Sequence, residues 1–244
     1  MATTSVITVP AFASAGSGVR HFFGTRGHAA QLQLGTGAPM RVAGRRAPLL
    51  LSVKQVHGTD ALVVDRPVNE TDRFEGGWDA LVTDQPGTMV AVRTADCVPV
   101  LVHDAGRRVV AAIHAGWRGA VAGIVPKTME LMRTRFGADV EQLRVSIGPS
   151  AGVCCYEVDE PVLDQVRQRF VWWEAVLRDH RGGKARLDLK TLIRRQVQDC
   201  GIAPDHVTSV NLCTICHDDL FFSYRREGKV IGTMVSAIGL TPER

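Results

Sequence analysis

Short runs of apolar residues, bounded by Gly, Pro or Asp, recur along most of this chain and limit the folds open to it. The runs are rich in Val and Leu, which is typical of β-strands. The predicted strands are Leu49–Val56, Ala61–Val64, Ala80–Thr83, Met89–Arg93, Val98–His103, Val109–His114, Leu143–Ile147, Val207–Leu212 and Val230–Ala237. Helical periodicity occurs at Ala120–Arg135, Pro161–Phe170 and Leu189–Cys200. Because the strands outnumber the helices and do not alternate with them, we expect an α+β protein.

Two of the predicted helices carry signals at their ends. Asp159 and Glu160 precede Pro161, which is a favourable arrangement for a first helical turn. In the last helix, Asp188 is the predicted N-cap and Gly201 the predicted C′ residue.

The composition is that of an ordinary globular protein. Of the 244 residues, 45% are hydrophobic and 22% are charged, and no internal repeat or Gly/Ser linker divides the chain. We therefore expect a single catalytic domain over residues 1–244. The net charge of +4 is small and dispersed, so nucleic acid is not an expected partner.

Neither a membrane span nor an export signal is predicted. No apolar stretch approaches the roughly 18 residues that a spanning helix needs. The N-terminal segment has no basic residue before Arg20, and Pro10 interrupts its short apolar stretch, so we interpret it as an extended lead-in. The expected location is cytoplasmic, with the six cysteines present as reduced thiols or metal ligands.

The segment 94–119 brings a cysteine and a histidine into one predicted hairpin. Its two apolar runs flank Asp104-Ala105-Gly106-Arg107, which reads as a tight turn. If the hairpin is symmetric about the middle of this turn, Cys97 lies directly opposite His114, with Cβ atoms about 5 Å apart. A longer loop would shift this register, and Pro99 indicates imperfect pairing near the cysteine.

A third metal ligand is available at the end of another predicted strand. His57 closes the apolar segment LLLSVKQVHG and is followed by Gly58, so it too is expected at a strand terminus. Two imidazoles and one thiolate suit zinc, and three protein ligands leave one position open for water or substrate. We therefore predict a zinc centre with the ligands His57, Cys97 and His114, which would also be the catalytic centre; the alternative is that these side chains are ordinary packing residues.

The remaining cysteines are interpreted as structural. The sequence Cys213-Thr214-Ile215-Cys216-His217 matches a haem attachment pattern, but that attachment belongs to exported proteins. A lone pair of this kind also lacks the second pair that a zinc ribbon requires, so we interpret these thiols as structural ones beside an active site. Cys154 and Cys155 are adjacent, so their side chains point apart in an extended chain and packing is the expected role.

Seven motifs occur in a characteristic order along residues 20–228. They are RHFFGTRG, KQVHG, DALVTD, TADCVPVL, HAGWRG, IGPSAGVCCYEV and CTICHDDLFFSYRREG. Together they resemble the laccase-domain, or YfiH-like, family, long labelled multi-copper polyphenol oxidases and better described as zinc-dependent purine nucleoside phosphorylases. The resemblance implies a mixed β-sandwich flanked by helices, in αββα layers. It also implies that the metal is bound by His57, Cys97 and His114.

The resemblance further implies an activity. Similar proteins phosphorolyse adenosine, inosine, guanosine and methylthioadenosine, so the expected partners are a purine nucleoside and phosphate, and adenosine deamination is an additional expected activity. The chain departs from the family at His28–Gly37, where a usual segment is shortened, and at Gly232-Thr233, where the family often has Gly-Arg. Both departures concern substrate contacts and leave the predicted metal ligands intact.

Phosphorolysis calls for groups that hold an anion and move a proton. Arg26, Lys54 and Arg118 are the predicted substrate-binding residues, because guanidinium and ammonium groups near the metal ligands could hold phosphate. Asp96 could transfer a proton near the base, or orient neighbouring groups. For deamination, the zinc deaminases place a Glu two residues after the His ligand. Gly116 occupies that position here, so another acid or base must serve, or deamination is a minor activity.

Other functions remain open from the residues. Cys97 could act as a nucleophile with His114 as its base, in an amidase. The resemblance implies peptidoglycan precursors as its substrate, because similar proteins are linked to peptidoglycan quality control. Zinc could instead stabilise a non-catalytic nucleoside-binding module, although three ligands rather than four argue against this. Copper-dependent phenol oxidation is disfavoured, because eight histidines, most in loop-like segments, do not easily supply a mononuclear and a trinuclear copper site.

Overall fold

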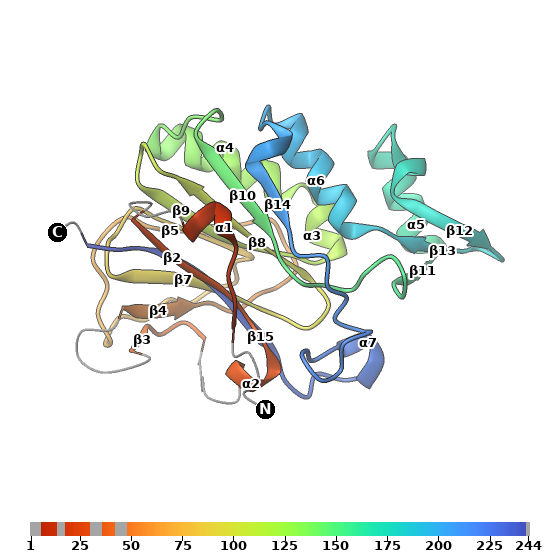
Figure 1. Ribbon diagram of the computed structural model, residues 1–244, viewed down its shortest axis with the longest axis horizontal. Coiled ribbons are helices and arrows are strands. Elements are labelled where there is room, and N and C mark those ends of the chain that lie inside the picture. Colours follow the sequence, from red (N-terminus) through yellow and green to blue (C-terminus); the bar gives the residue numbers. More distant parts are fainter. Residues whose placement is uncertain (1–5, 14–17, 30–35, 42–47, 243–244) are drawn as a thin grey trace.

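Two mixed β-sheets packed face to face form the centre of the protein. The structure is a computed structural model that describes residues 6–13, 18–29, 36–41 and 48–242 (Figure 1). The first sheet has the order β1 (Val6–Ile7), β2 (Val19–Gly24), β15 (Met234–Leu240), β7 (Thr88–Thr94), β4 (Leu49–Ser52), β3 (Met40–Arg41). The second has the order β14 (Val207–Ser209), β10 (Leu143–Ile147), β8 (Val98–Asp104), β9 (Val109–Ala115), β6 (Ala80–Thr83), β5 (Ala61–Val64).

The alternation of side chains along the strands divides the core into two parts. Leu101 and Val110 of the second sheet are fully buried against the first sheet, in one cluster with Val90. Their neighbours Val100 and Val102 point to the other face of the second sheet and join a separate cluster that includes the helices. Strands β8 and β9 are therefore apolar on both faces, as the sequence predicts.

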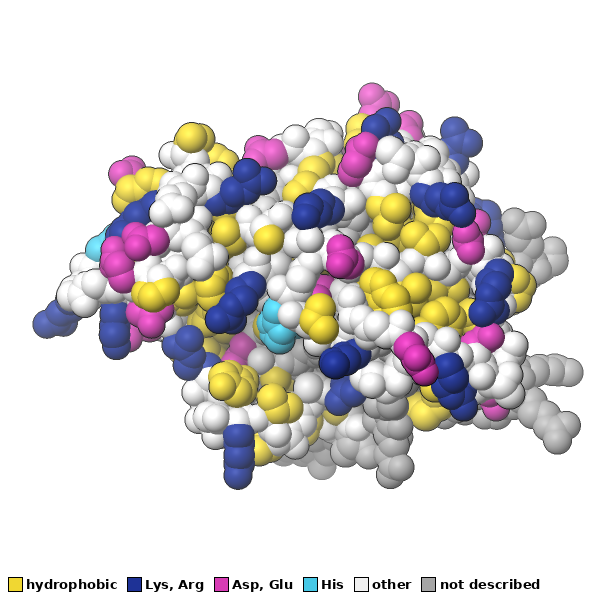
Figure 2. Space-filling model, turned by 180° about the vertical axis from the view of Figure 1, so that it is seen from behind, with side chains coloured by type: hydrophobic (Ala, Val, Ile, Leu, Met, Phe, Trp, Pro, Cys, Tyr) yellow, Lys and Arg dark blue, Asp and Glu magenta, His cyan; other side chains and the backbone are white. Residues whose placement is uncertain are grey.

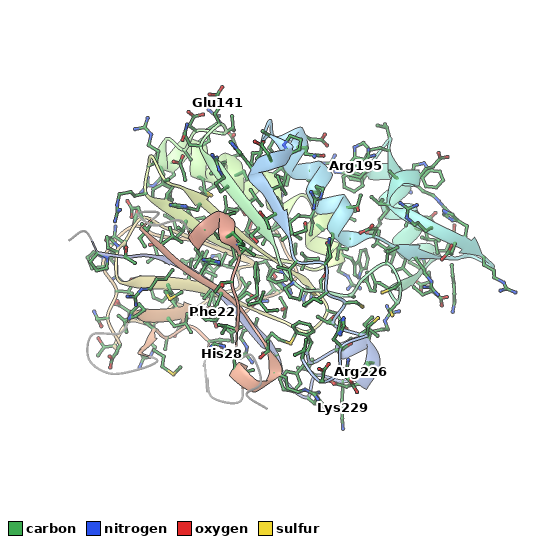
Figure 3. The ribbon with its side chains drawn as sticks, viewed as in Figure 1. Phe22, His28, Glu141, Arg195, Arg226 and Lys229 are labelled. Carbon is green, nitrogen blue, oxygen red and sulfur yellow. The ribbon has the colours of Figure 1, made fainter. Side chains whose placement is uncertain are left out.

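Helices cover the outer faces of both sheets. The second sheet is covered by α3 (Trp117–Ala122), α4 (Ile124–Phe136) and α6 (Leu189–Asp199), while α5 (Glu160–Arg169) lies beside a smaller sheet at one end of the protein (Figure 1). On the first sheet, the short α2 (Arg26–Ala29) lies over β2, where the ring centroids of Phe22 and His28 are 4.8 Å apart (Figure 3). The predicted α+β sandwich flanked by helices is confirmed.

The remaining elements lie at the margins of the sandwich. A three-stranded sheet of β11 (Glu157–Asp159), β13 (Lys184–Leu187) and β12 (Leu177–Arg181) projects at one end beside α5 (Figure 1). The other short elements are α1 (Pro10–Ala13), η1 (Trp173–Ala175), η2 (Pro204–His206) and α7 (Tyr224–Glu227).

Several predicted element bounds are confirmed and others are corrected. The strands at Ala61–Val64, Ala80–Thr83 and Leu143–Ile147 are found as predicted. The Asp188 carboxylate caps α6 by accepting a hydrogen bond from the amide of Thr191. The helix predicted at Ala120–Arg135 is wrong as one element, because Gly123, in the left-handed conformation, ends α3 and begins α4.

The register of the β8–β9 hairpin differs from the prediction by two residues. A four-residue turn, rather than a two-residue one, joins Asp104 to Val109, so Pro99 and not Cys97 lies opposite His114. A shift of two residues keeps every side chain on its original face. Cys97, just before β8, therefore stays on the same face as His114, one diagonal step away.

Charged side chains of both signs are mixed on the surface. On the face shown in Figure 2, basic side chains are scattered among acidic and uncharged ones and form no continuous basic patch. None of the helices in the described part of the chain combines the length and apolar character that crossing a bilayer requires.

Candidate metal centre

The three predicted metal ligands come together at one end of the sandwich. Ligand atoms of His57, Cys97 and His114 all lie within 4.8 Å of one another, and Cys97 Sγ is 3.9 Å from His57 Nε2. His114 is buried on β9, Cys97 is partly buried before β8, and His57 is exposed. The group is therefore anchored in the core on one side and open to solvent on the other.

His57 reaches this position from a loop, not from the end of a strand as predicted. Strand β4 ends at Ser52, and the chain then turns through His57, whose φ of 61° lies in the left-handed region. Non-glycine residues adopt this conformation only where the surroundings hold them there, and such residues cluster at functional sites.

The surroundings that hold His57 are supplied by Asp79. Its carboxylate accepts hydrogen bonds from the backbone amides of Val56 (3.2 Å), His57 (2.9 Å) and Gly58 (2.6 Å). The same carboxylate is 2.7 Å from His114 Nδ1, which donates to it. This bond leaves Nε2 of His114 free to bind a metal, and a carboxylate behind a histidine ligand typically fixes its tautomer and orientation.

The charges of the group stabilise one another. Burial alone would raise the pKa of the Asp79 carboxyl, but hydrogen bonds from His114 and Gly58 outweigh it and hold that pKa below its usual range. Burial would lower the pKa of His114, yet its hydrogen bonds to Asp79 and Cys97 raise it to about 9. Although burial opposes ionisation of the Cys97 thiol, the two histidines lower its pKa to about 7. Cys97 is thereby prepared to act as a thiolate ligand.

This donor set fits a divalent metal ion. Two imidazoles and one acidified thiol converge from three separate segments, with a carboxylate behind His114. Within the described ranges, only one other group of three or more potential ligands is close enough to hold an ion, and it contains cysteines alone. Histidine clusters of the kind that a trinuclear copper site needs are therefore absent from the described part.

Gly116 allows the ligands to approach helix α3. A Cβ atom at this position would lie 2.9 Å from His57 Cδ2 and 3.0 Å from Cys97 Sγ. Its φ of −68° is open to any residue, so the requirement for glycine is one of space alone.

Replacing Gly116 with Ala should therefore displace one ligand and weaken zinc binding by about tenfold or more, since coordination tolerates shifts of only about 0.2 Å. The measurement is a zinc titration against a competing chelator. Gly106→Ala is the matched control, because a Cβ there would be 3.4 Å from its nearest neighbour and far from the ligands. Equal zinc affinity in both variants would contradict this role of Gly116.

A cavity of about 420 Å³ opens beside the three ligands. It is lined by Gln55, His57, Arg93, Ala95, Asp96, Cys97, His114, Trp117, Arg118, Tyr156, Leu189, Tyr224, Arg225, Val230 and Thr233. Its size is that of a small-molecule site. The aromatic and aliphatic side chains offer a surface for a flat apolar ring, and the three arginines favour an anion.

The predicted substrate-binding residues are only partly gathered at this cavity. Arg118 lines it, and the Arg118 guanidinium stacks on the ring of Trp117, 4.5 Å from the centroid. Arg26 instead pairs with Glu227 at 2.9 Å and is not among the lining residues. Lys54 is exposed and is also outside the lining.

Asp96 is in the cavity wall, but its carboxylate is already engaged. One oxygen accepts a hydrogen bond from Thr214 Oγ1 (2.6 Å), and the other accepts from Ser223 Oγ (3.0 Å) and from the Arg225 amide (2.7 Å). Like His57, Asp96 has a positive φ, of 92°. Of the two predicted roles, these contacts favour orienting its neighbours over transferring a proton.

Sequence reasoning missed several residues of the site. Asp79 stands in the motif DALVTD, yet nothing in its spacing shows that it would bond to His114. Arg93 and Arg225 line the cavity from β7 and α7. Thr233, at a departure from the family pattern, also lines it and accepts a hydrogen bond from Arg93 Nε at 3.2 Å. Of the other departing segment, His28–Gly37, residues 30–35 lie outside the described residues.

Several known proteins are similar to this chain over most of its length. The sequence model of the family described as "Multi-copper polyphenol oxidoreductase laccase" matches residues 39–241. The chain is 40% identical over 163 residues, 66% of its length, to a purine nucleoside phosphorylase of Bacteroides thetaiotaomicron, and spans 60% of that relative. It is 35% identical over 204 residues to the purine nucleoside phosphorylase YlmD of Geobacillus stearothermophilus, covering 78% of this chain and 72% of that one.

Two further proteins extend the comparison. An adenosine deaminase, RL5, from an unknown prokaryotic organism is 34% identical over 185 residues, which is 73% of this chain and 70% of that protein. Among solved structures, the hypothetical protein YfiH of Bacillus licheniformis superposes with a TM-score of 0.80 at 27% identity, covering 98% of both chains. The fold of the described chain is thus that of YfiH over almost its full length.

Proposed function

Because this chain belongs to the family described as multi-copper polyphenol oxidoreductase laccase, we propose that it is a zinc-dependent purine nucleoside phosphorylase with adenosine deaminase as a second activity. The proposed substrates are adenosine, inosine, guanosine and methylthioadenosine, each with phosphate. The observation that supports this most is the placement of two imidazoles and a thiolate at the wall of a cavity that carries three arginines.

The proposed zinc ligands are His57, Cys97 and His114, with Asp79 orienting His114 and the loop that carries His57. When bound, zinc would supply a Lewis acid at the cavity wall. The thiolate and the two imidazoles neutralise only part of the charge of a divalent ion, so the site stays attractive to an electron-rich substrate atom.

In phosphorolysis a phosphate oxygen forms a bond to the anomeric carbon of the sugar while the bond from that carbon to the purine breaks. We assign phosphate binding to Arg118 and Arg225, whose guanidinium groups stack on Trp117 and Tyr156 at the cavity wall. Stacking fixes the plane of each guanidinium. Arg225 Nη1 also donates to the Glu157 carbonyl oxygen at 2.5 Å, so its other N–H groups are those that would bind phosphate. Tyr156 and Leu189 would pack against the purine, which leaves with the electron pair of the broken bond.

Gln55 and Arg93 form the polar side of the cavity. The Gln55 amide group is bonded twice to the backbone of Arg93, donating to its carbonyl oxygen and accepting from its N–H, both at 2.8 Å. These two hydrogen bonds fix the Gln55 side chain against the backbone of Arg93. The Arg93 guanidinium in turn donates a hydrogen bond to the Thr233 hydroxyl. We assign these residues to orienting the pentose, a role that depends on rigid positioning.

Replacing Arg118 with Ala should raise KM for phosphate about tenfold and change KM for the nucleoside much less, because one charge-assisted contact to the anion is lost. Steady-state kinetics with each substrate varied in turn would measure this. Arg195→Ala is the matched control, since Arg195, labelled in Figure 3, also stacks on a tryptophan, Trp172, but is not a lining residue. A normal phosphate KM in the Arg118 variant would remove this residue from the proposal.

The function itself is tested by incubating zinc-loaded protein with adenosine or inosine, with and without phosphate, and identifying the products by chromatography. Release of free base only when phosphate is present is the expected result. Formation of inosine from adenosine without phosphate would establish the deaminase activity. If folded, zinc-loaded protein yields neither product, the proposed function is wrong.

A further inference from the structure

A second cluster of potential metal ligands lies outside the catalytic group. Cys154 and Cys155 follow β10, and Cys213 and Cys216 follow β14, so the cluster joins two loops that are far apart in sequence. The four Sγ atoms all lie within 4.8 Å of one another. Cys154 and Cys216 are exposed, whereas Cys213 is buried, with 8% of its surface accessible.

The adjacent pair contributes both of its thiols because the chain turns at this point. Residues 153–155 form a turn in which the Cys155 and Tyr156 amides both donate to the Gly152 carbonyl oxygen at 2.9 Å. The prediction that the side chains of Cys154 and Cys155 point apart assumes an extended chain and is wrong here. Their sulfur atoms instead lie 3.6 and 3.3 Å from the sulfur of Cys216.

These distances suit a shared metal ion better than a covalent bond. A disulfide requires about 2.05 Å between its sulfur atoms. Four thiolates around zinc at about 2.3 Å are separated from each other by about 3.8 Å in a tetrahedron. The two sulfur–sulfur separations, 3.6 and 3.3 Å, are closer to this tetrahedral value than to the length of a disulfide bond. Four protein ligands also leave no open position on the metal for water or substrate. We propose that Cys154, Cys155, Cys213 and Cys216 bind a structural zinc ion, separate from the catalytic centre.

The backbone around Cys213 favours the thiolate form of this one cysteine, whereas burial and neighbouring thiols raise the pKa of Cys154, Cys155 and Cys216 in the absence of a metal ion. The Gly152 amide donates a hydrogen bond to Cys213 Sγ at 3.2 Å. Burial would raise the pKa of the Cys213 thiol, but this bond and those from the Cys216 and Ile215 amides lower it. Such N–H···S bonds offset the charge that accumulates when several thiolates share one ion.

A partly buried lysine lies beside the cluster, and although burial lowers the pKa of its ammonium group to about 8, the neighbouring thiols act to raise it. Lys190 Nζ donates to the carbonyl oxygens of Val210 and Leu212 at 2.9 and 2.8 Å, which fixes it beside the loop of Cys213. Cys213 and Cys154 are among the negative groups that interact with it. The Arg186 guanidinium also donates to the Cys154 carbonyl oxygen. The net charge of a zinc ion with four thiolates is −2, and these two basic side chains lie where they would balance it.

The proposed ion would hold one wall of the catalytic cavity together. The loop with Cys154 and Cys155 leads directly into Tyr156, and the loop with Cys213 and Cys216 leads into α7 with Arg225, both lining residues. Hydrogen bonds already join the two loops near this point, from the Thr214 amide to the Ser150 carbonyl oxygen (2.9 Å), from the Ser150 amide to the Leu212 carbonyl oxygen (3.4 Å) and from the Gly152 amide to Cys213 Sγ. A metal ion bound to both loops would restrict their separation as a disulfide does, and remain reversible.

The test is the zinc content of protein freed of loosely bound metal, measured by mass spectrometry together with protein concentration. We expect wild-type protein to hold one zinc ion per chain more than the double variant Cys154→Ser/Cys216→Ser. His57→Ala should lose only the catalytic ion and keep the other. In that variant, replacement of zinc by cobalt should give the intense charge-transfer absorption of a tetrahedral thiolate site. None of these readouts depends on enzymatic activity, so the result stands whatever the reaction proves to be.

Cys200→Ser is the matched control, because Cys200 is a partly buried thiol at the end of α6 that belongs to neither cluster. It should retain both ions. Titration of wild-type protein with a mercurial reagent provides a second measurement that needs no variant, and zinc should be released as the exposed thiols react. Equal zinc content in wild-type protein and the double variant would overturn the proposal. So would a disulfide within the cluster of protein purified under reducing conditions.

Discussion

Replacing His57 with Ala is expected to lower the rate of phosphorolysis by about 1000-fold or more. His57 is exposed and lies on a loop, so its loss should leave the fold and the Cys97–His114 pair intact. A centre that retains only two ligands should no longer hold zinc tightly, and the several kcal/mol of charge stabilisation that a metal provides would disappear with it. Metal content and kcat/KM measured on the same preparation would check this.

The same variant separates the metal-dependent function from the amidase alternative. If Cys97 were a nucleophile and His114 its base, both would remain in place and catalysis would survive the loss of His57. His180→Ala is a suitable control, since His180 is exposed and packs against Trp173 on the three-stranded sheet. Activity retained by the His57 variant after complete chelation would support the nucleophile.

Replacing Asp79 with Asn should produce the second-largest effect. The shape of the side chain is conserved, but its charge is lost and an amide N–H₂ replaces one acceptor oxygen. At least one of the bonds to Gly58, His57 and His114 must then be lost. Removing a partner of this kind typically lowers metal affinity by about 10–100-fold. The unsatisfied buried donors should also reduce the free energy of unfolding by about 1–3 kcal/mol.

Two measurements are needed to separate these effects. Competition with a chelator gives the zinc affinity, and thermal unfolding of the metal-free protein gives the contribution to stability. Asp205→Asn, at an exposed position in η2, should leave both unchanged. An Asp79 variant that binds zinc as tightly as the wild-type protein would show that this carboxylate does not position the ligands.

The strands and the grouping of His57, Cys97 and His114 could be predicted because they depend on local patterns. Strands β8 and β9 are mainly apolar runs that are buried throughout, and a short apolar run of this kind is typical of a buried β-strand. Cys97 and His114 lie on the same face of the hairpin as predicted, although the predicted register is wrong. The register differs by two residues, and a shift of two residues keeps each side chain on its face. The β12–β13 hairpin was missed because its strands are polar and mostly exposed, apart from Leu177, Ala185 and Leu187.

Contacts between distant segments could not be predicted from one sequence. The positive φ of His57 depends on three amides that converge on Asp79, a residue 22 positions further along the chain. The hydrogen bonds of Asp96 reach Thr214 and Ser223, more than one hundred positions away. The sequence around Asp79, Thr214 and Ser223 gives no sign of these contacts. The hydrogen bonds that support the site could therefore be identified only from the three-dimensional structure.

The central claim is that His57, Cys97 and His114 bind one zinc ion in the native protein. It is tested most directly by anomalous diffraction from crystals of the purified protein, recorded on both sides of the zinc absorption edge. The account predicts a zinc peak about 2.0–2.3 Å from His57 Nε2, His114 Nε2 and Cys97 Sγ. Crystals of catalytically active protein with no anomalous peak among these three side chains would contradict it.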